Sequence, residues 1–288
     1  MNKIDRKPAV AGQFYTADPI ELKKEVETYL KLAQKVNNSD VLAVISPHAG
    51  YIFSGKIAAL SIKQIDENKD YENIFIIGLS HRKHLNGAAV YCIGDFQMPG
   101  FKAEVNINLC NELIKKCQFI EFDQYAHQYE HSIEVQLPFL HYHLKKNFKI
   151  VPILMGTGDV DKIETIANYL KPFLNEKNIF VVSTDFSHYP SFDDAQIADK
   201  TTAEAFVAND VNKFIEAMYD NEKIKNLSTS ACNWASMACL LYMTQNQKKL
   251  YEYQIIDYQN SGHTPWGDKT GVVGYYAISL QKKSNNGQ

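Results

Sequence analysis

Three histidines stand just beyond short, wholly apolar segments of this 288-residue chain. Neutral imidazole is a common ligand for zinc, copper and iron, and it also transfers protons near neutral pH. If the apolar segments are strands of one parallel sheet, their carboxyl ends meet at the edge where such sheets bind ligands. We therefore predict one shared site for metal binding or proton transfer. Its histidines are His48 after the segment 41–45, His81 after 74–77 and His188 after 179–182.

Two further side chains offer a third ligand for such a metal site. Cys232, in the segment STSACNWASM, precedes an apolar helical stretch and would supply a thiolate. Asp185, shortly before His188, would instead give the arrangement of two histidines and one carboxylate that is typical of oxygen-activating iron. Alternatively, Asp185 orients a metal ligand through a hydrogen bond. The local sequence leaves these interpretations open.

The segment HQYEH matches the H-x-x-E-H pattern of inverted zinc peptidases. On one helix, His127 and His131 would hold zinc and Glu130 would act as the base. The residues before His127 lack a helical pattern, however, and the apolar period begins only after His131. We therefore favour a helix over 131–144 whose N-terminal dipole stabilises Glu130 and Glu134, with His131 pointing toward the shared site.

Apolar segments rich in β-branched residues alternate with segments of helical period along the chain. Apolar segments without internal alternation suit strands that are buried on both faces of a mostly parallel sheet. Strands are expected at 41–45, 74–77, 90–93, 150–154, 179–182, 253–257 and 272–278, the last two as a hairpin. Helices are expected after an N-cap at Asp18 and at 57–65, 107–117, 131–144, 163–174, 195–207 and 237–243.

This alternation predicts an α/β fold with a mostly parallel central sheet flanked by helices. The composition does not change along the chain, and no linker or repeat interrupts it. We therefore expect a single domain over residues 1–288, with a disordered tail at 282–288.

The composition argues against several classes of protein. The net charge of -3 at pH 7 and the pI of about 6.3 give no basic surface for nucleic acid. Apolar runs fall well short of a membrane span, and the first residues lack the apolar core of a secretory signal. Five cysteines without a CxxC pair indicate reduced thiols, so we expect a cytoplasmic protein. An oligomer fits this composition as well as a monomer does.

The chain resembles the Memo-like protein family in six ordered segments: PAVAGQFYTAD, ISPHAGYIFSG, GLSHRKHLNG, EHSIEVQLPFL, VVSTDFSHY and GVVGYYAISL. The resemblance covers residues 8–280. This family is widespread in bacteria and archaea, and its eukaryotic member is named as a mediator of cell motility. The family is similar in fold to the class III extradiol ring-cleaving dioxygenases, which implies a single α/β domain.

The resemblance implies a ligand set. His48 and His81 match the two metal-ligand histidines of the dioxygenases, and Cys232 matches the cysteine that replaces the dioxygenase carboxylate in Memo-like proteins. The family usually has glycine after this cysteine, whereas this chain has Asn233. A site with a thiolate is softer than one with a carboxylate. We expect one transition metal ion, iron or copper, with zinc as the alternative.

The resemblance also implies catalytic groups. His188 matches the acid/base histidine of the dioxygenases, and Asp185, Glu130 and His131 are implied to line the same pocket. His127 has no counterpart in the family, which argues further against the zinc-peptidase interpretation.

Three functions fit these residues. The first is a metal-dependent, dioxygenase-like oxidoreductase that acts on a small substrate, with proton transfer by His188. The second is a zinc hydrolase that uses His188 or Glu130 as its base. The third is a non-catalytic module that binds a phosphopeptide or a small ligand. In each case the partner is a small molecule or peptide, and aromatic walls are expected from Tyr51, Phe53, Tyr189 and Trp266.

Overall fold

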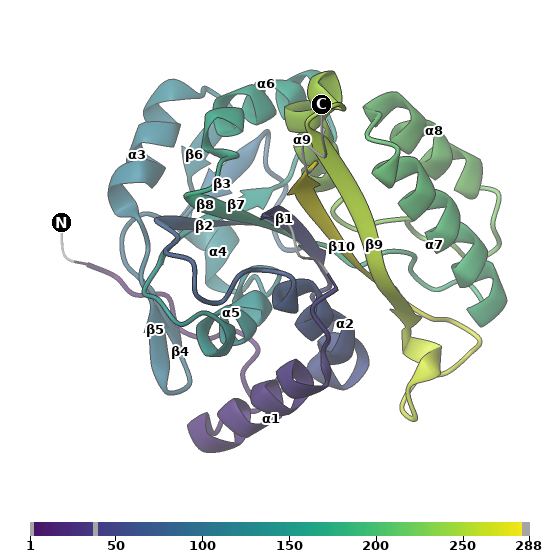
Figure 1. The fold of residues 1–288 in the computed structure, drawn as a ribbon, viewed down its shortest axis with the longest axis horizontal. Coiled ribbons are helices and arrows are strands. Elements are labelled where there is room, and N and C mark those ends of the chain that lie inside the picture. Colours follow the sequence, from purple (N-terminus) through teal and green to yellow (C-terminus); the bar gives the residue numbers. More distant parts are fainter. Residues whose placement is uncertain (1–2, 37–39, 284–288) are drawn as a thin grey trace.

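The computed structural model describes residues 3–36 and 40–283 and places a large sheet between two layers of helices (Figure 1). The strands are β1 (Val41–Ser46), β2 (Asn73–Leu79), β3 (Ala88–Val90), β4 (Phe96–Met98), β5 (Phe101–Ala103), β6 (Ile120–Phe122), β7 (Lys149–Met155), β8 (Asn178–Ser183), β9 (Tyr251–Asn260) and β10 (Gly274–Lys282). Eight of them form one sheet in the order β6-β3-β7-β2-β8-β1-β10-β9, and β4 pairs with β5 in a separate hairpin.

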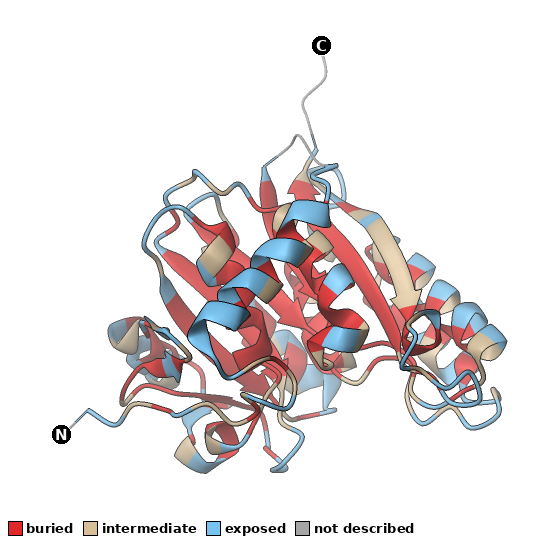
Figure 2. Ribbon diagram, turned by 90° about the horizontal axis from the view of Figure 1, so that it is seen from below, coloured by how far each residue is buried: buried red, intermediate tan, exposed pale blue. Residues whose placement is uncertain are grey.

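Helices cover both faces of the sheet. They are α1 (Pro19–Leu32), α2 (Tyr51–Lys63), α3 (Ile107–Lys116), α4 (Gln124–Gln128), α5 (Leu137–His143), α6 (Val160–Leu170), α7 (Phe192–Val207), α8 (Val211–Asn221) and α9 (Trp234–Thr244), with short 3-10 turns between some of them. One layer contains α1, α2 and α5, and the other contains α6 to α9 (Figure 1). Figure 2 shows the sheet buried between helices whose outer faces are exposed.

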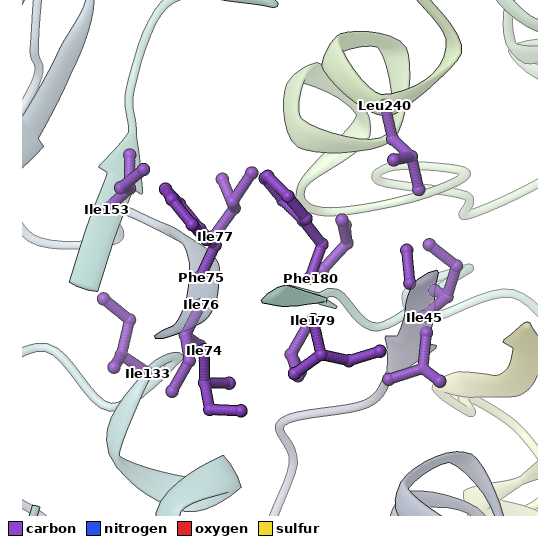
Figure 3. Close-up of a cluster of buried hydrophobic side chains, with 14 of the residues drawn as sticks. Ile45, Ile74, Phe75, Ile76, Ile77, Ile133, Ile153, Ile179, Phe180 and Leu240 are labelled. Atoms are coloured by element: carbon purple, nitrogen blue, oxygen red, sulfur yellow. The ribbon is translucent and has the colours of Figure 1, made fainter. Parts of the chain in front are cut away.

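The four central strands β7, β2, β8 and β1 run parallel to one another. Every residue of β1 and β8 is buried, because helices cover both faces of these strands. In Figure 3, Phe75 and Phe180 lie on the face toward Leu240 of α9, whereas Ile74 and Ile179 lie on the opposite face. The rings of Phe75 and Phe180 stack with their centres 4.5 Å apart. The predicted α/β fold with a mostly parallel central sheet is therefore confirmed.

The two edges of the sheet differ from its centre. β10 pairs antiparallel with both β1 and β9, and the predicted hairpin is confirmed. The strand expected at 90–93 instead ends at Val90, since the residues after it hydrogen-bond to the N-terminal segment, as in the 2.8 Å bond from Ile4 N–H to Ile93 O. Of the predicted tail 282–288, Lys282 lies in β10 and residues 284–288 fall outside the described residues.

The helix expected over 131–144 is shorter than predicted. Glu130 accepts the backbone N–H groups of His131 and Ser132 at 2.8 and 2.9 Å, so a turn precedes the helix. A 3-10 turn over Glu134–Gln136 follows, and α5 begins at Leu137. The sequence analysis also did not predict the short elements α4 and β4 to β6, or helix α8.

Candidate metal centre

The carboxyl ends of β1 and β2 bring two histidines together. His48 and His81 each lie two residues beyond their strand, and their ring centres are 5.1 Å apart. Cys232 lies on the loop before α9, with its Sγ 3.4 Å from His48 Nε2. One donor atom from each residue lies within 4.8 Å of the other two. The 3.4 Å between Cys232 Sγ and His48 Nε2 falls within the roughly 3–4 Å between ligand atoms around a tetrahedral ion.

Hydrogen bonds determine which nitrogen of His48 faces Cys232. Ser183 Oγ donates its proton to the carbonyl oxygen of Ser132, 2.5 Å away. The 3.1 Å bond between Ser183 Oγ and His48 Nδ1 must then be donated by Nδ1, which leaves the lone pair on Nε2. Burial, reinforced by His81, lowers the pKa of His48 to about 3, so the ring is neutral. A neutral imidazole with a free Nε2 is the form that binds metal.

A carboxylate orients His81 in the same way. His81 Nδ1 donates to Glu130 Oε1 at 2.9 Å, and the backbone N–H of His81 donates to Glu130 Oε2 at 2.6 Å. Burial alone would raise the pKa of Glu130, but the hydrogen bond and charge of His81 outweigh it and hold this pKa at about 2. A carboxylate behind Nδ1 is a common support for a metal-binding histidine, because it fixes the ring and leaves Nε2 free.

Cys232 is held at the ends of β2 and β8 by its neighbour. Asn233 Nδ2 donates to the carbonyl oxygens of Ile77 and Ser183, so this residue has a structural role where the family usually has glycine. Cys232 Sγ accepts the backbone N–H of Asp185 at 3.3 Å. Burial, with a further effect of the Asp185 carboxylate, raises the pKa of the Cys232 thiol well above its ordinary value. A bound cation would be needed to ionise this thiol.

Asp185 and His188 lie beside these three residues. Asp185 Oδ1 accepts the backbone N–H of His48 at 2.8 Å, and Oδ2 lies 3.9 Å from His48 Nε2. Burial raises the pKa of Asp185 above its ordinary value. His188 Nδ1 donates to the carbonyl oxygen of Phe186 at 2.9 Å, so its Nε2 is left for the cavity.

His131 completes the cluster. Its ring stacks on that of His81 with the centres 4.6 Å apart, and burial lowers its pKa to about 4. His81, Glu130 and His131 form a second group of closely spaced donor atoms. Gly78 makes room for the turn that carries His131, because a Cβ at Gly78 would lie 2.4 Å from Ser132 Oγ. The predicted site residues thus come together at one edge of the sheet, apart from Tyr51.

Comparison with known proteins identifies the family. The sequence model of the Memo-like protein family matches residues 6–279. The chain belongs to the Memo-like family. A MEMO1 family protein of Methanopyrus kandleri is 32% identical over 290 residues, which cover 97% of this chain and 100% of that protein. A MEMO1 family protein of Nitrosopumilus maritimus is 30% identical, with 96% and 99% of the two chains covered.

A solved structure supports the fold of this Memo-like chain. The crystal structure of an uncharacterized protein from Escherichia coli K12 is similar with a TM-score of 0.53. The match covers 82% of this chain and 98% of the other, at 12% sequence identity. At this identity the similarity concerns the fold alone. No helix among the described residues of the Memo-like chain has the length and apolar character needed to cross a membrane.

A cavity of about 540 Å³ opens over the histidine cluster of this Memo-like protein. His48, His81, His131, Asp185 and His188 lie in its lining, with walls from Phe14, Ile52, Phe53, Tyr189, Trp266 and Tyr275. Tyr51, which was expected in a wall, is instead buried beneath the cavity, and its hydroxyl donates to Val135 O at 2.7 Å. Tyr51 belongs to the core because it is the first residue of α2 and packs on Phe139.

His127 is separated from this site. Its Nε2 donates to the carbonyl oxygen of Ala89 at 3.1 Å, and its ring packs against Tyr91 and Phe96. Helix α4 ends at Gln128, so the HQYEH segment does not lie on one helix. Among the described residues, His127 belongs to neither group of closely spaced donors. The geometry of an inverted zinc peptidase is therefore absent from the described part of the chain.

The sequence analysis missed a buried ion pair next to the site. The Arg6 guanidinium donates to Glu134 and to the carbonyl oxygens of His127 and Glu130. Glu134 also accepts the backbone N–H groups of Ala9 and Val10 and the hydroxyl of Tyr15. Its carboxylate is thus stabilised by these donors and by Arg6, and not by a helix dipole as expected. We call Arg6, Tyr15, His127 and Glu134 the Arg6 cluster. No local pattern in the sequence indicates that these residues pair.

Proposed function

We propose that this Memo-like protein is a metal-dependent oxidoreductase in which His48, His81 and Cys232 hold one iron or copper ion. The observation that carries the proposal is that the three donor atoms lie within 4.8 Å of one another. Both histidines are also tied through Nδ1 to other protein groups, which leaves each Nε2 free for a metal.

The chemistry of the donor set fits such an ion. Two neutral imidazoles and a thiolate form a soft site that suits copper, iron or zinc more than magnesium or calcium. Because burial raises the pKa of Cys232, a metal ion would have to displace the thiol proton when it binds. When bound, iron or copper would supply the electron-transfer chemistry that protein side chains lack.

The surrounding residues of the chain would bind and move protons. His188 is the group suited to proton transfer, since Nδ1 is held by Phe186 O and the ring lines the cavity. Asp185 fixes the backbone of His48 through Oδ1 and brings Oδ2 close to the same centre. His131 and Glu130 orient His81 and restrict its movement. The cavity walls would exclude water from a small substrate.

Elemental analysis of protein purified without oxygen is the most direct test. We expect close to one iron or copper ion per chain, and oxygen uptake on addition of a small phenolic substrate. The His188→Ala variant should keep the metal and lose turnover, because His188 is proposed to act on substrate rather than to bind the ion. His84→Ala is the matched control, since His84 is exposed on the loop that follows His81.

Three outcomes contradict the proposal. A protein that holds no metal and takes up none at micromolar concentration is not a metalloenzyme. A protein that holds zinc alone, with activity toward ester, amide or phosphate substrates, is the hydrolase considered from the sequence. A His188→Ala variant that retains the full cellular function, beside pocket-filling substitutions that abolish it, indicates a binding module.

A further inference from the structure

The cavity over the metal centre has an unusual balance of charge. The charged side chains in its lining, apart from the histidines, are Asp185 on the floor and Asp268 on the loop between β9 and β10. Neither lysine nor arginine lines the cavity among the described residues. In the metal-free chain, an anionic ligand would lose its hydration there without gaining a positive charge from a lysine or arginine side chain.

Two cationic side chains beside the site, those of Lys269 and Arg6, are engaged elsewhere. Lys269 follows Asp268 in the chain, but its Nζ lies over the ring of Phe192, 4.9 Å from the ring centre. The guanidinium of Arg6 is buried in its ion pair with Glu134. Neither side chain belongs to the lining, so neither supplies a counter-charge for a phosphate or a carboxylate in the cavity.

The mouth of the cavity is aromatic. Trp266 is 72% exposed and Tyr189 is 60% exposed, although both are large side chains that proteins usually bury more deeply. Tyr189 also has a φ of 72°, which is costly for a residue with a side chain. This conformation is maintained by the 2.7 Å bond from Tyr189 N–H to Val272 O. The hydrogen bond therefore fixes the point at which the Tyr189 side chain leaves the backbone, and the ring lines the mouth of the cavity.

We propose that this cavity receives a small molecule with an aromatic body and a cationic amino group, and that it discriminates against anionic ligands. Aromatic faces attract both flat apolar groups and ammonium groups. Asp268 adds a carboxylate at the same mouth. The inference rests on the proposed function only in taking this cavity as the substrate site. It disfavours a phosphopeptide as the ligand.

Matched small probes can test this preference on the full chain without added metal. The probes are 2-phenylethylamine, 2-phenylethanol, phenylacetate and phenyl phosphate, which share a ring and differ in charge. The chain has two tryptophans, so a Trp234→Phe variant leaves Trp266 as the single fluorescent reporter at the cavity. Calorimetry provides a second measurement of the dissociation constants.

We expect the amine to bind about three- to tenfold more tightly than the alcohol, from its contacts with aromatic faces and Asp268. Both acids should bind at least about tenfold more weakly than the alcohol, because they lack a counter-charge. The Asp268→Asn variant should lower the advantage of the amine about two- to fivefold and leave the alcohol unchanged. Asp220→Asn, at an exposed position of α8, removes the same charge elsewhere and should change neither.

Equal affinity for amine and alcohol overturns the proposal, as does tighter binding of either acid. The proposal is also overturned if no probe saturates the binding signal at millimolar concentration. These results are independent of the proposed function, because metal binding is measured by titration with iron, copper or zinc in the absence of the probes.

Discussion

The candidate metal centre and the Arg6 cluster both combine histidine and carboxylate groups, yet they differ in exposure and in where their hydrogen bonds end. His81 is exposed and Cys232 is partly exposed, whereas the side chains of Arg6 and Glu134 are buried. In the Arg6 cluster, Glu134 accepts four donors and His127 Nε2 donates to a carbonyl. At the candidate metal centre, His48 and His81 each donate Nδ1 to a protein group, while His48 Nε2 faces the Cys232 thiol at 3.4 Å and His81 lines the cavity. The Arg6 cluster is closed by protein groups, whereas the candidate metal centre has a thiol and a cavity beside its histidines.

The pKa values of the two regions do not reveal this difference. Burial is the main cause that lowers the pKa of His48 to about 3, and it does the same for His127. A perturbed pKa reports burial in both cases. The orientation of Nε2, toward a cysteine in one region and toward a backbone carbonyl in the other, is what distinguishes a proposed metal ligand from a structural histidine.

The largest expected effect is on metal binding. We expect His48→Ala and His81→Ala each to abolish stoichiometric binding, because each removes one of three donors. His127→Ala should keep the metal and lower only stability. Calorimetric titration and elemental analysis measure the stoichiometry. Full occupancy in the His48→Ala/His81→Ala double variant would place the ligands elsewhere, with His127 and His131 as the first residues to test.

The second effect is on stability and concerns the Arg6 cluster. Arg6→Ala leaves the carboxylate of Glu134 buried without its partner, so we expect a loss of about 3–5 kcal/mol in the free energy of unfolding. Urea denaturation followed by circular dichroism measures this loss. Lys116→Ala removes an exposed pair with Glu112 and should cost less than about 1 kcal/mol. Equal losses in the two variants would contradict the prediction that the buried Arg6–Glu134 pair stabilises the fold more than an exposed pair does.

A third effect separates the ligands by strength. Cys232→Ser replaces a soft thiolate with a harder hydroxyl, and we expect the affinity to fall about ten- to a hundredfold or the preference to shift from copper toward harder metals. Competition titrations with copper and zinc measure both quantities. Cys239→Ser is the matched control, because Cys239 is buried on α9 away from the donors. Unchanged affinity and preference in Cys232→Ser would assign the third position to Asp185.

The smallest effect concerns Asp199, a residue of α7. Its carboxyl is buried and accepts hydrogen bonds from protein groups, as Glu134 does in the Arg6 cluster, but it has no cationic partner among the described residues. Ser187 N–H and Tyr258 O–H donate to it at 2.8 Å each. Burial outweighs these bonds and raises its pKa to about 7. The folded state therefore holds a proton that the unfolded state releases near pH 4.

The sign of the pH dependence follows from this difference. Between about pH 4 and pH 7 the folded chain binds more protons at this site, so its contribution to stability falls as the pH rises. Asp199→Asn should remove this contribution, and the difference in unfolding free energy between wild type and variant should change over that window. Urea titrations at several pH values measure it, with exposed Asp220→Asn as the control. A constant difference between wild type and Asp199→Asn would show that Asp199 is not protonated on folding.

The framework of the site follows from the pattern of apolar residues along the sequence. Continuous apolar runs predict strands buried on both faces, and this prediction is confirmed for β1, β2, β7 and β8. Because parallel strands end at a common edge, the positions of His48 and His81 follow from the pattern alone. Ordered motifs along nearly the whole chain also sufficed to indicate the Memo-like family.

Only the tertiary structure decided how the polar groups pair. His48 and Cys232 are 184 residues apart, and Arg6 and Glu134 are 128 apart, so no local pattern specifies either contact. A hydrophobic period reports whether a residue is buried, but it carries no information on which buried polar groups meet. Burial forces each polar group to find a partner, and packing between distant segments selects it. This selection closed the Arg6 cluster around His127, placed His48 Nε2 opposite Cys232 and left His81 in the lining of the cavity.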